Sequence, residues 1–253
     1  MSNTTFSVEK RADGTAIATI DRADTMNSMD QAFFHDLIDL MDACDTDIEI
    51  DACVLTGAGR AFSAGGDFRS FQELETLRDI RRHLRLVYDA FHSVERAEVT
   101  VIAAVNGVAF GGGCELTIAS DFAIASTAAS FAFKEATVGL MPGYGVIRGP
   151  EIIGKRWTRR MAMTGEAVDP QTAMSIDLVH EVVEPDKLID TAVALAARIR
   201  ENAPWGVRLA KQFINRDQGA PGIAESIEAT ALLMMTPEHK SRIEAFFASR
   251  DRG

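Results

Sequence analysis

The chain has 253 residues, of which 47% are hydrophobic, and a formal net charge of −11 at pH 7. This hydrophobic content is enough for a sizeable core, whereas so acidic a chain repels polyanions such as nucleic acids. No stretch is long and apolar enough to span a membrane, the first residues do not resemble a secretion signal, and the three cysteines are too widely spaced to predict a zinc or redox site. We therefore expect a cytoplasmic α/β protein.

The first fifty residues predict a hairpin followed by a helix. Apolar residues recur at every second position on both sides of Asp13 and Gly14, which indicates two strands joined by a turn. After Asp30 the spacing becomes that of an amphipathic helix. One apolar ridge of that helix contains Phe33, Leu37, Met41 and Cys44.

Short buried strands and helices are expected to alternate further along the chain. The strands are predicted at residues 52–56, 101–105, 122–126 and 130–133. Such alternation favours an α/β arrangement with short, stacked sheets. After about residue 185 the pattern is helical, with helices predicted at 188–200, 204–216, 222–235 and 237–249. The apolar run at 231–235 is expected to pack on the body or on another subunit.

The most informative segment runs from Asn106 to Glu115, where three consecutive glycines follow a buried strand and precede a helix-compatible run. Glycines let a ligand approach the backbone, and the amides in the first turn of a helix are unpaired at the positive end of its dipole. The Gly112 amide is therefore a candidate donor to a developing oxyanion, with Glu115 near the same helix face. The alternative is a tightly packed helix start with Glu115 as an N-terminal charge.

A second loop of small residues, from Gly57 to Asp67, offers the Gly66 amide to the same ligand atom. Two such donors form an oxyanion hole, and each is typically worth roughly 3 kcal/mol of transition-state stabilisation. The spacing of the two loops leaves open whether they meet.

Glu135 follows the predicted strand at 130–133 and precedes a segment that contains Gly139, Pro142 and Gly143. A carboxylate at the end of a strand can face a cleft, and two carboxylates can hold one water and move protons in both directions. The alternative is a solvated loop residue.

Other candidate motifs carry less information. Ser63 only half matches a nucleophile elbow, and no histidine is tied to it by sequence. The histidines are expected to have surface or structural roles. Four arginines at 78, 81, 82 and 85 predict a solvated helix face, with a phosphate-binding patch as the alternative.

Three segments taken together closely resemble the signature segments of the enoyl-CoA hydratase/isomerase (crotonase) family, namely Ala61–Asp67, Asn106–Leu116 and Phe133–Gly143. The resemblance runs almost from end to end and implies a spiral of repeated strand-strand-helix turns with a helical C-terminal trimerisation region. It divides the chain into a spiral catalytic domain, residues 1–185, and a helical region, residues 186–253, that serves oligomerisation and covers the site. It also implies a homotrimer or a dimer of trimers.

The resemblance further implies an enoyl-CoA hydratase, in which Gly66 and Gly112 hold the thioester oxygen while Glu115 and Glu135 hold the water. Coenzyme A would enter as part of the acyl-CoA substrate, with no separate cofactor, no metal and no nucleic-acid or membrane partner. Val108 would lie near the acyl group. The other residues expected to bind the substrate are Phe62, Ala64, Asp67, Phe68, Arg69, Gly111, Pro142 and Gly143.

The chain departs from the family pattern at several positions, including Arg250, which stands in place of the family's C-terminal lysine. Asp24 stands where many members have a lysine that meets the CoA phosphates, and Lys134 stands where a proline is common. Tyr144 replaces a residue that is usually small, which suggests a shortened, polar or ring-bearing acyl chain. The competing enzymatic hypotheses are an enoyl-CoA isomerase that uses Glu135 as its proton shuttle and another acyl-CoA lyase. A non-catalytic RNA-binding relative is disfavoured by the acidic charge.

Overall fold

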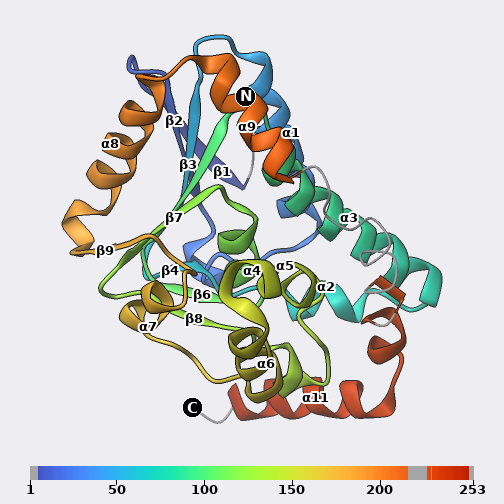
Figure 1. The fold of residues 1–253 in the computed structure, drawn as a ribbon. Coiled ribbons are helices and arrows are strands. Elements are labelled where there is room, and N and C mark those ends of the chain that lie inside the picture. Colours follow the sequence, from blue (N-terminus) through green and yellow to red (C-terminus); the bar gives the residue numbers. More distant parts are fainter. Residues whose placement is uncertain (1–4, 216–226, 229, 251–253) are drawn as a thin grey trace.

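The computed structural model of the chain describes residues 5–215, 227, 228 and 230–250 (Figure 1). The predicted hairpin is confirmed, because β1 (Phe6–Lys10) and β2 (Thr15–Ile20) pair antiparallel. Gly14 has a φ of 71°, a backbone conformation that glycine adopts without strain in such a turn. β2 then pairs in parallel with β3 (Ala52–Gly57) and starts the larger sheet.

Two sheets make up the body. The larger has the strand order β1-β2-β3-β5-β7-β9 and is parallel from β2 onward, whereas the smaller has the order β4-β6-β8 and is entirely parallel. The remaining strands are β4 (Ala61–Ser63), β5 (Thr100–Val105), β6 (Val108–Phe110), β7 (Phe122–Ser126), β8 (Ser130–Ala132) and β9 (Glu181–Val183).

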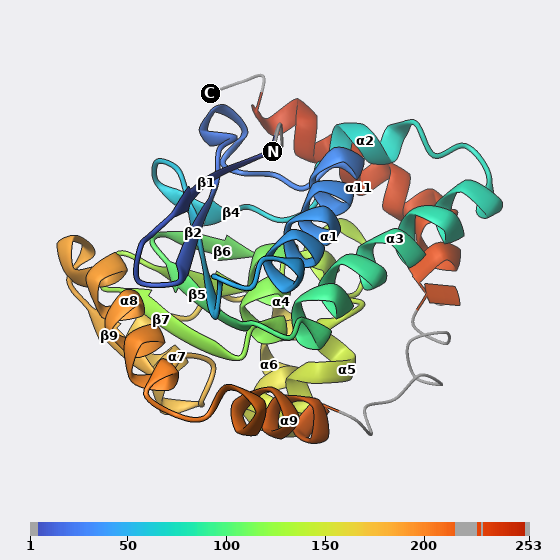
Figure 2. The same cartoon turned by 90° about the horizontal axis from the view of Figure 1, so that it is seen from above.

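Successive turns of the chain place one strand in each sheet before a helix follows. β3 and β4 precede α2 (Phe68–Gln72) and α3 (Leu77–Arg96), and β5 and β6 precede α4 (Gly112–Ala119). β7 and β8 lead into the short helix η2 (Glu135–Val138). The predicted spiral of strand-strand-helix turns is therefore confirmed, and it stacks equivalent strand ends of neighbouring turns side by side (Figure 2).

Helices cover both faces of the larger sheet. α1 (Gln31–Thr46) begins where the sequence predicted, because the Asp30 carboxylate accepts a hydrogen bond from the Phe33 amide and caps the helix. Its buried ridge packs with α3 on one face of the sheet. On the other face, α8 (Leu188–Arg200) buries Leu188, Ala192 and Ala196 against the strands.

The C-terminal helices are α8, α9 (Pro204–Asn215) and α11 (Pro237–Arg250), as the pattern of the sequence predicted. The expected helix at 222–235 lies partly outside the described residues. Of its apolar run, Ala231 and Met234 are buried on the body whereas Leu232 and Met235 are exposed. The division of the chain at residue 185 stays a prediction.

The segment between β8 and β9 is built from short helices that the sequence pattern did not predict. They are α5 (Gly145–Gly149), η3 (Pro150–Gly154), α6 (Lys155–Thr164) and α7 (Pro170–Ser175). Two further single-turn helices are η1 (Ala23–Thr25) and η4 (Pro185–Lys187). Within the described part of the chain, no helix is long and apolar enough to cross a membrane.

Candidate active site

A cavity of about 110 Å³ lies where the loops after β4, β6 and β8 meet α3. Its wall combines the glycine-rich backbone of two loops, both glutamates singled out in the sequence, and apolar side chains from α1, α3 and the C-terminal region. The spiral explains this convergence, because equivalent loops of successive turns follow neighbouring strands of the smaller sheet.

The two glycine-rich loops meet in space. A methyl group placed on Gly65 would lie 2.7 Å from the Phe110 carbonyl oxygen and 3.2 Å from the Gly112 nitrogen. The Met29 amide donates to the Gly65 carbonyl and the Asp67 amide donates to the Met29 carbonyl, which makes a parallel bridge centred on Gly66. In a parallel bridge the amide of the central residue points away from the paired strand, so the Gly66 N–H is not used by the Met29 segment, and Gly66 itself lines the cavity.

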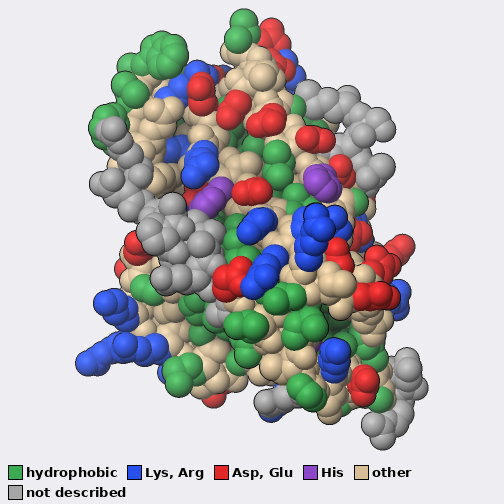
Figure 3. All heavy atoms as spheres, turned by 90° about the vertical axis from the view of Figure 1, so that its right-hand side faces the viewer, with side chains coloured by type: hydrophobic (Ala, Val, Ile, Leu, Met, Phe, Trp, Pro, Cys, Tyr) green, Lys and Arg blue, Asp and Glu red, His purple; other side chains and the backbone are tan. Residues whose placement is uncertain are grey.

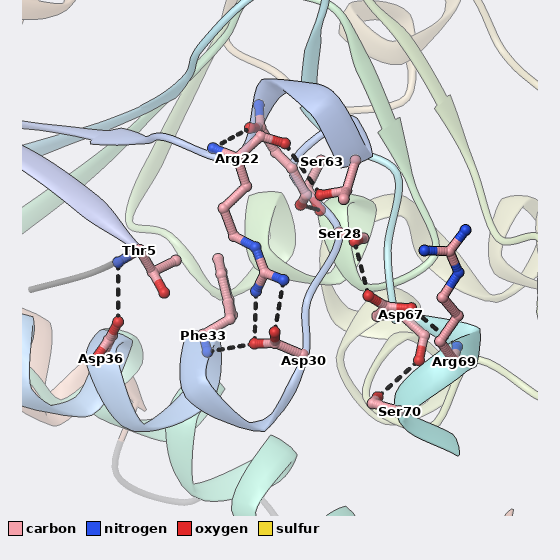
Figure 4. A network of polar contacts seen from close by, with 12 residues as sticks. Thr5, Arg22, Ser28, Asp30, Phe33, Asp36, Ser63, Asp67, Arg69 and Ser70 are labelled. Atoms are coloured by element: carbon pink, nitrogen blue, oxygen red, sulfur yellow. Dashed lines mark hydrogen bonds and ion pairs between the residues drawn. The ribbon is translucent and has the colours of Figure 1, made fainter. Parts of the chain in front are cut away.

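Hydrogen bonds to side chains hold the first loop in place (Figure 4). The buried Asn27 donates to the carbonyls of Ala58 and Ala61, at 3.0 and 2.7 Å. The Ser63 hydroxyl donates to the Asn27 carbonyl and accepts from the Gly65 amide. Because this hydroxyl is fully buried and engaged with backbone, Ser63 is a structural residue rather than a presented nucleophile.

The second loop ends at the start of α4, where Gly112 is the first helical residue. Its amide precedes the intrahelical hydrogen bonds and lies at the positive end of the helix dipole. Gly111 caps the helix with a φ of 52°, and a methyl group on it would lie 2.7 Å from the Glu135 Oε1. The absence of a side chain at Gly111 therefore leaves room for Glu135.

Glu115 is buried on α4, and its Oε1 accepts hydrogen bonds from the amides of Tyr144 and Gly145, at 2.9 and 2.8 Å. Burial disfavours the charged carboxylate and raises the pKa of Glu115 to about 7, although the two amides act in the opposite direction. The group is therefore poised to accept or release a proton near neutral pH.

Glu135 opens η2 and lines the same cavity. The residue is partly exposed, but its Oε2 is buried and has no hydrogen-bond partner among the described residues. Burial, followed by the negative charge of Glu115, raises the pKa of Glu135 well above its ordinary value. The protonated form of Glu135 is thus favoured more than that of a solvent-exposed glutamate.

Substituting Gly111 with Ala is expected to lower the free energy of unfolding by about 1–3 kcal/mol, because the side chain would be strained at this φ and would press on Glu135. Chemical denaturation of the variant and the native protein measures the difference. Gly206 is the matched control, since a methyl group on it meets no atom within 4 Å. Equal destabilisation by both substitutions would contradict this account.

The structure brings together only some of the predicted substrate-binding residues. Ala64, Phe68, Gly111 and Gly143 line the cavity with the four catalytic candidates, Gly66, Gly112, Glu115 and Glu135. The other five lie outside its lining: Phe62, Asp67, Arg69, Val108 and Pro142. The Phe62 side chain is fully buried in the core, and Asp67 accepts a hydrogen bond from the Arg69 amide at the start of α2. Their contact with a substrate stays a prediction.

Tyr144 lines the cavity, as its position in the sequence led us to expect. Its ring packs against Phe91 at 5.1 Å, and the phenol lies by the buried ion pair of Arg148 with Glu95. Burial and then the Glu95 charge raise the pKa of the phenol. Tyr144 thus forms a rigid, neutral part of the wall whose own backbone amide also positions Glu115.

Sequence reasoning missed two polar residues of the cavity wall, His83 and Thr230. A signal for His83 was present, because it shares the spacing of Ile80, Leu84 and Phe91 on the buried face of α3. The neighbouring arginines concealed that pattern and suggested a wholly solvated region. Thr230 belongs to the C-terminal region and carries no motif that would have indicated its place.

The arginine run on α3 lines an open hollow with Leu86 and Asp89. On this side of the molecule, positive side chains gather among acidic ones (Figure 3). Arg81 pairs with Glu228 and Arg82 pairs with Asp79. These ion pairs support the predicted solvated helix face, and the phosphate-binding alternative stays untested.

The spiral is the crotonase fold. An enoyl-CoA hydratase/isomerase from Mycobacterium paratuberculosis superposes with a TM-score of 0.88 at 28% sequence identity, over 96% of this chain and 98% of that one. One from Pseudoalteromonas atlantica gives a TM-score of 0.87 at 25% identity, over 97% and 98%. The shared fold covers nearly the whole of each chain.

The sequence comparisons agree with the fold. The family model for enoyl-CoA hydratase/isomerase matches residues 10–251. The short-chain-enoyl-CoA hydratase of Clostridium acetobutylicum is 34% identical over 93% of this chain and 92% of that protein. The 2,3-dehydroadipyl-CoA hydratase of Escherichia coli is 32% identical over 92% of each. The chain belongs to the enoyl-CoA hydratase/isomerase family, and the predicted resemblance is confirmed.

Proposed function

We propose that the protein is an enoyl-CoA hydratase that adds water across the 2,3 double bond of a 2-enoyl-CoA thioester. The observation that carries the proposal is the pair of carboxyl groups, Glu115 and Glu135, in the same cavity wall as Gly66 and Gly112. The relatives named as hydratases at 32–34% identity support it.

The thioester oxygen would lie between the amides of Gly66 and Gly112. Addition at C3 moves the π electrons toward C2 and this oxygen, so the oxygen carries more negative charge in the enolate than in the substrate. Donors fixed by the backbone stabilise that charge more than they stabilise the ground state, which lowers the barrier. Gly112 adds the positive end of the α4 dipole to its hydrogen bond.

The two carboxyl groups would divide the proton transfers. Ionised Glu115 removes a proton from the water molecule while the water oxygen forms the bond to C3. Protonated Glu135 then gives its proton to C2 of the enolate. Burial raises the pKa of both groups, and the charge of Glu115 adds to the rise at Glu135, which supports Glu135 as the carboxyl group that starts protonated. The proton taken by Glu115 must return to Glu135 before the next turnover, and the cavity that both groups line gives this exchange a path through water or product.

The direct test is the loss of enoyl-thioester ultraviolet absorbance when the purified protein is mixed with crotonyl-CoA, followed by identification of 3-hydroxybutyryl-CoA as the product. Rapid loss with this product is the expected result. A protein that instead converts 3-hexenoyl-CoA into the conjugated 2-enoyl thioester, and does not hydrate crotonyl-CoA or 2-hexenoyl-CoA, would be an isomerase, and the hydratase proposal would be wrong.

Hydration is expected to decline at acidic pH. Because the pKa of Glu115 is raised to about 7 and the proposed base must be ionised, kcat/KM should fall about tenfold per pH unit below that value. Because burial and the charge of Glu115 also raise the pKa of Glu135, loss of its proton is expected to affect the alkaline side of the profile. Measurement of kcat/KM for crotonyl-CoA between pH 5 and 9 covers both the acidic and the alkaline side of the profile. A flat profile from pH 5 to 7 would contradict the role of Glu115.

The quaternary structure is part of the same proposal. The exposed side chains of Trp205, Leu209 and Phe213 on α9 form an apolar surface of the kind that subunit interfaces cover. They support the expected homotrimer or dimer of trimers. The cytoplasmic location stays a prediction.

A further inference from the structure

The imidazole of His83 is an unusual component of the cavity wall. The residue is 3% exposed, lines the cavity from α3, and has no hydrogen-bond partner for either ring nitrogen among the described residues. The rings of Phe34 and Phe71 flank it in edge-on contacts, with centroids at 5.8 and 5.4 Å. Aromatic neighbours fix the position of the imidazole without satisfying its nitrogens.

Thr230, from a distant part of the chain, is a second buried polar residue of the cavity wall. It is 5% exposed, lines the same cavity, and its Oγ1 has no hydrogen-bond partner among the described residues. A buried polar group without a hydrogen bond costs free energy, and most buried polar groups in proteins are paired. Two such groups in one substrate cavity point to a hydrogen-bonding ligand.

The charges around the cavity favour a neutral ligand group. Glu115 and Glu135 are both acidic, and the ammonium of Lys134, the one cation among the described lining residues, donates to the Gly165 carbonyl at 2.6 Å. Burial lowers the pKa of His83 to about 4, so its ring is neutral at pH 7 and offers one donor and one acceptor. A hydroxyl or carbonyl oxygen matches these groups better than a carboxylate does.

The position of His83 places this ligand group beyond the thioester. A methyl group on Gly66 would lie 2.7 Å from the Phe71 Cζ, and Phe71 is in turn in ring contact with His83. One aromatic ring therefore separates the proposed oxyanion donor from the imidazole. The part of the wall next to His83 on α3 is apolar, with Leu84 and Val87 on the same helix face, as an acyl chain requires.

We propose that the acyl chain of the substrate carries a neutral oxygen, a hydroxyl or carbonyl group, that hydrogen-bonds to His83 and Thr230. The proposal rests on the proposed function, because it takes the cavity to be the acyl site of an enoyl-CoA enzyme. It names polar 2-enoyl-CoA thioesters, rather than plain alkyl ones, as the substrate class.

The test compares 2-hexenoyl-CoA with its 4-, 5- and 6-hydroxy derivatives. We expect kcat/KM for at least one hydroxylated thioester to exceed that for 2-hexenoyl-CoA by about tenfold or more, as hydrogen-bonding sites discriminate against analogues that lack the polar group. In His83→Phe and Thr230→Val the ratio of kcat/KM for the hydroxylated thioester to kcat/KM for 2-hexenoyl-CoA should fall toward one. His83→Gln and Thr230→Ser keep hydrogen-bonding atoms and should retain part of this preference. The matched control is His35→Phe, at an exposed position, which should keep the native preference.

A binding measurement separates this proposal from the proposed function. Calorimetric titration with hexanoyl-CoA and its 4-, 5- and 6-hydroxy derivatives, which cannot be hydrated, should show the same preference and the same loss in His83→Phe. If no enoyl thioester is hydrated but the preference persists, hydration is wrong and the polar site stands. If hexanoyl-CoA binds as tightly as every hydroxylated form, or the preference survives both His83→Phe and Thr230→Val, the polar site is wrong.

Discussion

Replacement of Glu115 with Gln is expected to lower kcat for crotonyl-CoA hydration by about 10³-fold, and replacement of Glu135 with Gln should have an effect of similar size, as positioned acids and bases contribute 10²–10⁴-fold. Glutamine keeps the shape of each side chain and can still accept the amide hydrogen bonds that Glu115 receives from Tyr144 and Gly145. The loss would therefore report proton transfer rather than misfolding. Initial rates at saturating substrate measure it.

Glu181, an exposed residue of β9, provides the matched control, and Glu181→Gln should hydrate at the native rate. The same variants separate hydration from isomerisation. Full activity of Glu115→Gln on 3-hexenoyl-CoA, with loss of activity only in Glu135→Gln, would favour the single-carboxylate shuttle. Loss of crotonyl-CoA hydration in both supports a two-carboxylate mechanism.

Glu115→Gln is also expected to stabilise the fold at alkaline pH. The folded-state pKa of Glu115 is raised from an ordinary 4.5 to about 7, so the native state holds a proton that the unfolded state releases between these values. Stability from this group is present below pH 4.5 and is lost as the pH rises through 7. Because Gln resembles the protonated form, the variant should be more stable than the native protein at pH 8 by up to about 3 kcal/mol.

Urea denaturation at pH 5 and pH 8 measures this effect. The gain in unfolding free energy of Glu115→Gln over the native protein should be small at pH 5 and largest at pH 8. For Glu181→Gln, the change in unfolding free energy between pH 5 and pH 8 should equal that of the native protein. An equal change in unfolding free energy at both pH values would show that altered packing, rather than the ionisation of Glu115, is responsible. If Glu115→Gln is more stable but inactive, then the ionisable carboxyl group gives the native protein activity at the expense of stability.

Local patterns predicted the elements that have a clear period or cap. The helix after Asp30 and the helix at 188–200 were predicted because their apolar positions repeat at helical spacing. Strands of three residues, such as β4, β6 and β9, are too short to show alternation. The spiral itself followed only from the family resemblance, because the order of strands within a sheet depends on contacts between distant segments.

The chemistry of the site was predictable to a similar extent. Gly66, Gly112, Glu115 and Glu135 were chosen from loop composition and resemblance, and the structure brings all four to one cavity. The raised proton affinities of the two glutamates could not be read from the sequence, because they depend on burial and on the charge of one residue acting on the other. His83 and Thr230 were missed because their place in the wall depends on how distant segments pack.

The contact between Gly65 and Gly112 has a consequence for how this enzyme family can diversify. The proposed anion-binding donors are main-chain groups, so an ordinary amino-acid replacement cannot remove them unless it introduces proline or distorts the loops. The carboxylates and the wall residues are side chains that single mutations can exchange. On the proposed function, natural selection can therefore alter which thioester is accepted, and which protons move, while the proposed enolate-stabilising donors are inherited intact.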